Sequence, residues 1–343
     1  MPAAATSHPP FPVRDRAARP AAPDTYDLEP LGELGPGEPL VPVALDDAGR
    51  VVAYGQPPER HAKAWTVRGG VWQAGRWTEM GTVVRGLPVT AVGAGGLAVG
   101  HRRAGASPLQ AWASHRGAFG AEFWPEAESS AVAVNAVGEV AGHVAVTVDG
   151  RSRRRVFLHA GGAPRFLPVP AGTSAFAAGL NEAGTVLANC VHGLFDLRSQ
   201  ALLWSGDAVT VLRAEPGGGL WGTALTPAGR VCGRLLTPAG SFHAFLFEDG
   251  RVYDLHLGGA WQSEALAAND ACVVVGRCMG DDGRREAFRW TPADGLRPLA
   301  ALVRGAEDWV LQKAVAVNAA GWIAGVGRRD GATRGFLLRP VGA

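Results

Sequence analysis

The segment AVNAVGEVAGH, residues 133–143, recurs along most of the chain. Six further copies share its pattern: ALDDAGRVVAY (44–54), AVGAGGLAVGH (91–101), GLNEAGTVLAN (179–189), ALTPAGRVCGR (224–234), AANDACVVVGR (267–277) and AVNAAGWIAGV (316–326). Successive copies begin 42 to 49 residues apart. A regular period of this length indicates a repeat protein in which each copy is one supersecondary unit.

Each copy combines a turn with a strand. Asn or Asp placed three residues before Gly is typical of a type I turn, because the polar side chain can bond the backbone of its own turn. The residues around and after the turn, as in CVVVG (272–276), are apolar almost without interruption. Such runs predict strands that are buried on both faces, as in sheets packed face to face.

A second phrase with an aromatic or large apolar residue follows each turn. Its copies are KAWTV (63–67), QAWAS (110–114), RVFLH (155–159), QALLW (200–204), HAFLF (243–247), EAFRW (286–290) and RGFLL (334–338). In most copies a glycine turn and one more strand come next, as in EDGRVYDL (248–255). Each unit therefore has four antiparallel strands, and seven units predict an all-β, seven-bladed β-propeller.

The two ends of the repeat complement each other. The last unit has a third strand, RGFLL (334–338), but no fourth, whereas YDLEPLGELG (26–35) resembles the fourth-strand phrase VYDLHLGG (252–259) and precedes the first unit. We therefore predict that residues 25–35 supply the outer strand of the last blade, within a single propeller over 25–343. Closure of the ring would remove exposed strand edges. Residues 1–24, rich in Pro and Ala, predict a disordered tail.

The composition excludes several classes of protein. With 47% hydrophobic and 19% charged residues, the chain suits a soluble globular protein with a large core. A net charge of +2 gives no general attraction to nucleic acid or membranes. The four cysteines show neither zinc-site spacing nor a disulfide pattern, and we expect no cofactor. Without a signal peptide or a membrane-spanning stretch, we expect a cytoplasmic monomer.

The pattern A-x-x-N-x-x-G-x-V-x-G, followed by His243-Ala244-Phe245, resembles the HAF-repeat family, which is named after that tripeptide. The likeness extends from Tyr26 to Pro340. It implies a repeated β architecture and very little about function, so no catalytic residue can be carried over. Many members of that family look secreted, and this chain departs from them in lacking a signal peptide.

One position is equivalent in all seven units and lies directly after the second strand. Its residues are Tyr54, His101, His143, Asn189, Arg234, Arg277 and Val326. Strand ends are often polar simply because they reach solvent. The functional interpretation is a ring of polar groups around the mouth of the central channel, in which His101 and His143, on neighbouring blades, act as acid or base.

The connections between second and third strands are rich in arginine. They carry Arg102, Arg103, Arg151, Arg153, Arg154, Arg155, Arg198, Arg284, Arg285, Arg328, Arg329 and Arg334. Because these connections emerge on one face of a propeller, we expect a positive face suited to carboxylate or phosphate oxygens. Solvated loops in an arginine-rich protein are the alternative.

The connections that lead into the inner strands carry tryptophans beside acids. The tryptophans are Trp124, Trp221, Trp261 and Trp309, and the acids nearest to them include Glu128 and Glu264. Such tryptophans could fill gaps between blades. They could also form an apolar wall on the ligand-binding face, with the acids as polar contacts.

Two hypotheses about function follow. The first is a binding propeller whose Arg/His/Trp-lined mouth holds an anionic organic molecule or an acidic protein surface. The second is a cofactor-independent lyase, isomerase or cyclase, with a histidine as acid or base and arginine as the anion stabiliser in the same pocket. The chain lacks a phosphate-binding glycine loop, a nucleophile elbow and an HExxH motif, and its arginine loops lack the interleaved aromatics of nucleic-acid binders.

Overall fold

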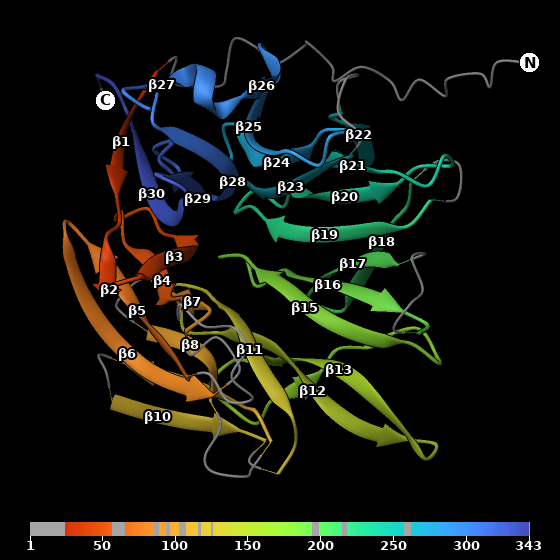
Figure 1. Cartoon of the computed structure of the whole chain (residues 1–343). Helices are drawn as coiled ribbons and strands as arrows, with labels where there is room; N and C mark the ends of the chain where they lie inside the picture. The colour runs from red at the N-terminus through yellow and green to blue at the C-terminus, as the bar shows by residue number, and fades with distance from the viewer. Residues whose placement is uncertain are drawn as a thin grey trace, which may run out of the picture.

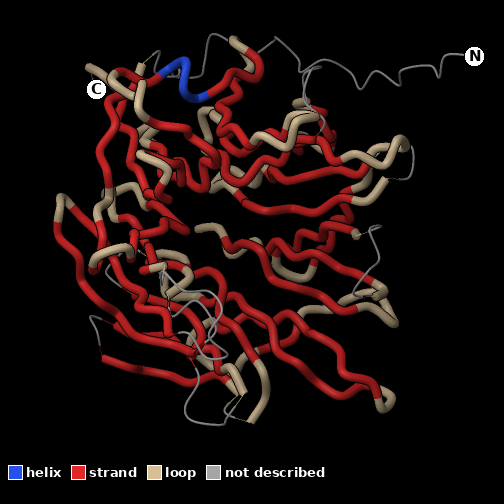
Figure 2. Tube along the Cα trace, viewed as in Figure 1, coloured by secondary structure: helices blue, strands red, loops and turns tan. Residues whose placement is uncertain are grey.

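The computed structural model describes residues 25–342 apart from 57–65, 85–88, 94–96, 103–107, 116–117, 125, 194–198, 215–217 and 257–261. The described chain forms seven sheets arranged in a ring, which confirms the predicted seven-bladed β-propeller (Figure 1). Figure 2 shows strand over most of the chain and one helical turn, the 3-10 helix η3 (Leu299–Leu302). Among the described residues, no helix is both long enough and apolar enough to cross a membrane.

Blades 1 to 3 follow one another along the chain. Blade 1 contains β2 (Glu33–Gly35), β3 (Glu38–Leu45), β4 (Val51–Gly55), β5 (Thr66–Gln73) and β6 (Arg76–Val84). Blade 2 contains β7 (Ala91–Val92), β8 (Leu97–Arg102), β9 (Gln110–His115) and β10 (Ala118–Phe123). Blade 3 contains β11 (Ser129–Val134), β12 (Val140–Val148), β13 (Arg151–His159) and β14 (Arg165–Phe166).

Blades 4 to 6 have the same order of strands. Blade 4 contains β15 (Ser174–Leu180), β16 (Val186–Val191), β17 (Gln200–Ser205) and β18 (Ala208–Leu212). Blade 5 contains β19 (Leu220–Leu225), β20 (Val231–Leu236), β21 (Phe242–Glu248) and β22 (Arg251–Asp254). Blade 6 contains β23 (Gln262–Ala268), β24 (Val274–Met279), β25 (Arg285–Thr291) and β26 (Gly295–Pro298).

Blade 7 joins the two ends of the repeat. It contains β28 (Trp309–Val317), β29 (Ile323–Arg329) and β30 (Ala332–Pro340), with β1 (Tyr26–Pro30) and then β27 (Val303–Arg304) added at its edge. β1 pairs antiparallel with β30, with Leu28 opposite Leu338, so the predicted closure is confirmed. The predicted extent of this strand is wrong at its end, because β2 pairs with β3 in blade 1 rather than with blade 7.

A glycine in the second strand sets the packing of most blades. Gly233 lies opposite Phe245 and Gly276 lies opposite Phe288. A Cβ added to Gly233 would lie 2.9 Å from the Phe245 ring, and one added to Gly276 would lie 2.8 Å from the Phe288 ring. The aromatic ring therefore occupies the space that a side chain on the second strand would need. Blade 4 pairs Ala188 with the smaller Leu202 instead.

The predicted third strand of the first unit, KAWTV (63–67), has the wrong register. Residues 63–65 lie outside the described residues, and β5 continues to Gln73 with Trp72 opposite Val51. The equivalent phrase is therefore RGGVW (68–72). It has Gly70 where most other blades have an aromatic residue. A Cβ added there would lie 2.8 Å from the ring of Trp77, which fills the space from β6.

The turns between first and second strands hold neighbouring blades together. An asparagine amide in one turn donates a hydrogen bond to a carbonyl of the next blade's turn. These bonds run from Asn135 to Asn181 (3.3 Å), from Asn181 to Thr226 (3.3 Å), from Asn269 to Asn318 (2.9 Å) and from Asn318 to Asp46 (3.1 Å). The last of these closes the circle from blade 7 to blade 1. We call this set of contacts the turn ring.

In blades 1 and 5 the turn residue lacks an amide donor, and an arginine replaces it. In blade 1, Arg50 Nε donates to Asp46 Oδ2 at 2.6 Å and Arg50 Nη2 donates to the Gly93 carbonyl of blade 2 at 3.1 Å. In blade 5 the turn residue is Thr226, and Arg230, again four residues later, donates to the carbonyl of Asp270 at 3.3 Å. No other unit has arginine at this position.

The Asp46–Arg50 pair of blade 1 can be introduced into blade 4 by mutation. Asn181→Asp keeps the acceptor oxygen of this buried side chain but loses the donor to Thr226 and Pro227. We expect the free energy of unfolding, measured with urea, to fall by about 1–3 kcal/mol. Adding Thr185→Arg, which copies the spacing of Asp46 and Arg50, should restore part of the loss. A double variant no more stable than Asn181→Asp would contradict the role given to Arg50.

The closing strand gives a second prediction. The Leu31 N–H donates to the Gly335 carbonyl at 3.0 Å, so Glu29, two residues earlier, falls at a hydrogen-bonded pair of the β1–β30 ladder. Glu29→Pro removes that donor and should cost about 1–3 kcal/mol of unfolding free energy. Glu29→Ala loses only the exposed ion pair with Arg339 and should cost less than about 1 kcal/mol. Equal losses in the two variants would show that the ladder contributes little.

Candidate functional site

The seven residues predicted to form a ring lie inside the second strands rather than after them. The side chains of this layer in blades 2 to 5 face the first strand of the following blade, whereas Arg277 of blade 6 bonds the first strand of its own blade. His101 Nδ1 lies 3.0 Å from Ser130 Oγ of blade 3, and the His143 ring lies 5.5 Å from that of Phe176 in blade 4. Tyr54 and Val326 lie opposite Val41 and Lys313 in their own blades.

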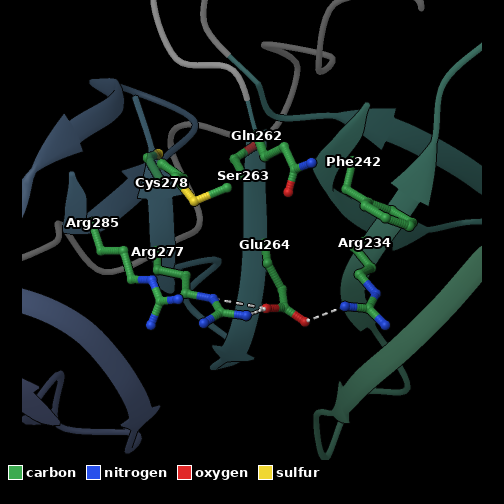
Figure 3. Close-up of a pocket in the computed structure, with 9 residues that line it drawn as sticks. Arg234, Phe242, Gln262, Ser263, Glu264, Arg277, Cys278 and Arg285 are labelled. Atoms are coloured by element: carbon green, nitrogen blue, oxygen red, sulfur yellow. Dashed lines mark hydrogen bonds and ion pairs between the residues drawn. The ribbon is translucent and has the colours of Figure 1, made fainter. Parts of the chain in front are cut away.

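Two members of the ring converge on one carboxylate. Glu264 lies on the inner strand β23, directly opposite Arg277 of β24. Arg277 donates to Glu264 Oε2 from Nε at 3.0 Å, with its Nη2 at 2.8 Å, while Arg234 Nη1 of the preceding blade lies 3.4 Å from Glu264 Oε1 (Figure 3). The structure thus brings together three of the predicted site residues. The Glu264 side chain is 14% exposed and both arginine side chains are 35% exposed.

These residues line a cavity of about 120 Å³, which we call the arginine pocket. Its lining residues are Arg234, Phe242, Gln262, Ser263, Glu264, Arg277, Cys278, Met279 and Arg285. This volume is well below the roughly 300–1,000 Å³ of pockets for drug-sized ligands, so the pocket suits a small ligand. Figure 3 shows Arg285 beside Arg277, with Phe242 above Arg234 on the other side of Glu264.

The arginine pocket has an excess of positive charge. Three guanidinium groups line it with one carboxylate, and the next acid, Glu286, is 50% exposed and lies 3.7 Å from Arg284. The Arg285 side chain forms no hydrogen bond or ion pair with any described residue, and the buried Arg234 Nε also lacks an acceptor among them. Donors therefore remain free in the pocket after Glu264 has been satisfied.

Apolar groups complete the pocket wall. The Arg234 guanidinium lies 4.9 Å from the Phe242 ring centroid and 5.8 Å from the ring of Trp221, which is half-buried on β19. Burial, with a smaller contribution from Glu286, raises the pKa of the Cys278 thiol to about 12. Cys278 is therefore a neutral thiol at neutral pH and adds a weakly polar surface rather than a nucleophile.

The two histidines lie elsewhere on the ring. Neither lines the arginine pocket, because they belong to blades 2 and 3 whereas the pocket is built by β20, β21, β23, β24 and β25. Burial lowers the pKa of His101 to about 4, and burial together with Arg154 lowers that of His143 to about 4. Both imidazoles are neutral at neutral pH, so neither is present there as the acidic imidazolium ion. A histidine acid in the same pocket as the arginines is not supported by this arrangement.

Asn189 has a structural position. It is buried, its Nδ2 donates to the Gly222 carbonyl at 2.7 Å, and its Oδ1 accepts from the Gly222 N–H at 2.7 Å. An amide that bonds both groups of one residue fastens blade 4 to blade 5 and leaves little capacity for a ligand.

The four predicted tryptophans do not share one place. Of the three that the structure describes, only Trp221 lies near the arginine pocket. Trp124 stacks on Phe166 at 5.1 Å and contacts Phe157, and the buried Trp309 packs edge-on against Phe336 at 6.1 Å, so both fill gaps between strands. Trp261 lies outside the described residues.

Much of the predicted arginine face is already paired with acids. Arg154 lies 2.8 Å from Glu128, Arg329 lies 2.6 Å from Asp308, and Arg334 lies 2.6 Å from Glu33. Arg103 and Arg198 lie outside the described residues. Arg151, Arg153 and Arg155, with Asp149, line a separate cavity of about 270 Å³ at the end of the β12–β13 hairpin. Glu128 is thus an ion-pair partner rather than part of the arginine pocket.

The sequence did not single out Phe242, Met279 or Arg285 as pocket residues. The signal was the register of the β24–β25 hairpin, which places Arg285 opposite Met279 and Ala287 opposite Arg277. Residues two apart on a strand share a face, so Arg277, Met279 and Arg285 lie on one side of the sheet. Within the described residues, no group of three or more His, Cys, Asp or Glu side chains could hold a metal ion, and the four cysteines are free.

Comparisons with known proteins agree with the fold. No family model and no curated protein match the chain. Among solved structures, the β-propeller domain of the Trilobed protease from Pyrococcus furiosus, described as having an open velcro topology, matches with a TM-score of 0.56 and 12% identity over 76% of this chain and 83% of that one.

Two further structures show the same likeness. A streptogramin B lyase matches with a TM-score of 0.50 and 13% identity over 93% of this chain and all of that one. An acylaminoacyl peptidase matches with a TM-score of 0.54 and 11% identity over 84% of this chain and half of that one. At these identities the likeness shows the propeller fold alone. The resemblance to the HAF-repeat family stays a prediction.

The geometry around Glu264 gives a prediction about stability. In the double variant Arg234→Ala/Arg277→Ala the mostly buried carboxylate loses its two arginine partners. We expect this variant to lose about 1–3 kcal/mol of unfolding free energy in urea titrations. Adding Glu264→Gln removes the unpaired charge and should recover most of the loss. If the double variant were as stable as the unmodified protein, Glu264 would not depend on these arginines.

Proposed function

We propose that this propeller binds a small organic anion in the arginine pocket and that the arginines bind the carboxylate of this ligand. The observation that carries the proposal is the convergence of Arg234, Arg277 and Arg285 on a cavity that contains a single acid, Glu264. Guanidinium groups bind carboxylates through paired charge-assisted hydrogen bonds. The Arg285 guanidinium forms no hydrogen bond or ion pair with a described residue, so its N–H groups are available to bind the carboxylate of the ligand.

The shape and lining of the pocket support a small molecule rather than a protein surface. The cavity of about 120 Å³ lies between the strands of blades 5 and 6, and Phe242 and Met279 offer apolar contacts for the carbon skeleton. Glu264 holds Arg234 and Arg277 in place, so their orientation is set before a ligand arrives. Preorganised donors lower the entropy cost of binding.

Titration calorimetry with malonate, succinate and glyoxylate tests the proposal. We expect at least one of them to bind with a Kd of about 1 mM or lower, which corresponds to about −4 kcal/mol. Malonamide, which has the skeleton of malonate but no charge, should not bind. Arg285→Gln should weaken binding about ten- to a hundred-fold, because a charge-assisted hydrogen bond contributes about 1.5–3 kcal/mol.

Arg251 on β22 provides the matched control. It is exposed and does not line the arginine pocket. Arg251→Gln removes the same charge from the protein as Arg285→Gln and should leave the affinity within about two-fold, since exposed charges beyond about 10 Å are screened at 0.1 M salt. Equal weakening by both variants, equal binding of malonamide, or no binding of any of the three acids would refute the proposal.

A further inference from the structure

The inner strand of blade 7 carries a lysine in the same layer as the acid of the arginine pocket. Lys313 of β28 lies opposite Val326, as Glu264 of β23 lies opposite Arg277. The strands β23, β24 and β25 of blade 6 all contact β28. Lys313 therefore occupies the position next to Glu264 around the ring, on the side of Arg277 and Arg285.

The ammonium group of Lys313 has an unusual environment. The side chain is half-buried and forms no hydrogen bond or ion pair with any described residue. Burial lowers the pKa of Lys313. The positive charges of Arg277 and Arg285 lower this pKa further, whereas the negative charge of Glu264 raises it. Burial and cationic neighbours both favour the neutral amine, which is the nucleophilic form.

The choice of residue type also favours a chemical role. Only two of the 33 basic residues are lysine, Lys63 and Lys313. Arginine would serve as well or better for holding an anion, because its guanidinium binds carboxylates in pairs. It cannot lose its proton near neutral pH, whereas a lysine in this environment can. A lysine at this place in an arginine-rich chain is thus suited to forming a covalent bond.

We infer that Lys313 is a nucleophilic amine that forms an imine with the carbonyl carbon of a small oxo acid bound in the arginine pocket. This inference rests on the proposed function, in which the arginines bind the carboxylate of the ligand. It goes further by naming the substrate class as acids that carry an aldehyde or ketone beside the carboxylate.

The covalent step uses only the amine and the oxo acid. The lone pair of neutral Lys313 Nζ attacks the carbonyl carbon, and the electron pair of the C=O bond moves to oxygen. A proton passes from nitrogen to that oxygen and gives a carbinolamine. Loss of the hydroxyl group together with the remaining proton on nitrogen releases one water and leaves the C=N bond. The arginines stabilise the carboxylate and the developing negative charge on oxygen.

Reductive trapping with glyoxylate tests this step on the full chain. Borohydride added at pH 7 delivers hydride to the imine and leaves a carboxymethyl group on the modified lysine, which peptide mass spectrometry locates. We expect Lys313 to be labelled at least about ten-fold faster than Lys63. Each unit by which the pKa falls raises the neutral fraction of an amine about ten-fold. Equal labelling of the two lysines would overturn the inference.

Matched variants separate the arginine contribution from simple amine reactivity. Lys313→Arg should abolish trapping at this site, and Lys63→Arg should leave it unaffected. Arg285→Gln should slow trapping of glyoxylate about ten-fold more than trapping of propanal, which has no carboxylate and is slowed only through the rise in the Lys313 pKa. Equal slowing with both aldehydes would show that the arginine does not act on the carboxylate.

The same samples distinguish failure of the inference from failure of the proposed function. If malonate binds to the arginine pocket but Lys313 is not trapped, the imine is refuted and anion binding stands. If no acid binds and Lys313 is not trapped, both are refuted. Protection of Lys313 from glyoxylate by added malonate would place the amine and the anion site in one pocket, and absence of protection would separate them.

Discussion

The contact between a second-strand glycine and a third-strand aromatic ring determines both the blade and the site. Gly233 lies under Phe245 and Gly276 lies under Phe288, with no room for a Cβ between them. Because side chains alternate along a strand, the residue after each glycine points to the face opposite the glycine. Arg234 and Arg277 follow these glycines directly. The packing of the core thus aims the two arginines at Glu264.

The fold was predictable from the sequence because most blades repeat the same turn, glycine and aromatic ring. The exceptions have local causes. Blade 1 has Gly70 in place of the aromatic residue, so the register read from KAWTV (63–67) was wrong, and β2 turns back to pair with β3. The neighbouring places of Arg234 and Arg277 followed from their equivalent positions. Their convergence on Glu264 did not, because the sequence placed Glu264 on a connection and the structure places it inside β23. The sequence did not predict that His101 and His143 lie outside the arginine pocket, because the repeat alone does not indicate which blades share a pocket.

The site exists because the repeat is imperfect where it faces the channel. The inner-strand residues that share the Glu264 layer include Ser130, Phe176, Trp221 and Lys313, and the second-strand partners change with them. Asn189 bonds the backbone and His143 contacts an aromatic ring, whereas blades 5 to 7 place several cations of this layer beside one acid. Identical side chains in this layer would give seven similar interfaces between blades. The variation among them instead gives the charged arginine pocket between blades 5 and 6.

The closed circle of blades has a consequence for how the protein comes apart. In an open repeat array the end unit has one neighbour, so it can fray at the cost of a single interface. Here Asn318 bonds Asp46, β1 pairs with β30, and each blade has a neighbour on both sides. Unfolding of any one blade must break its interfaces with both neighbouring blades and open the closed propeller. Local fraying is thereby discouraged, and the propeller should lose its structure in one concerted transition.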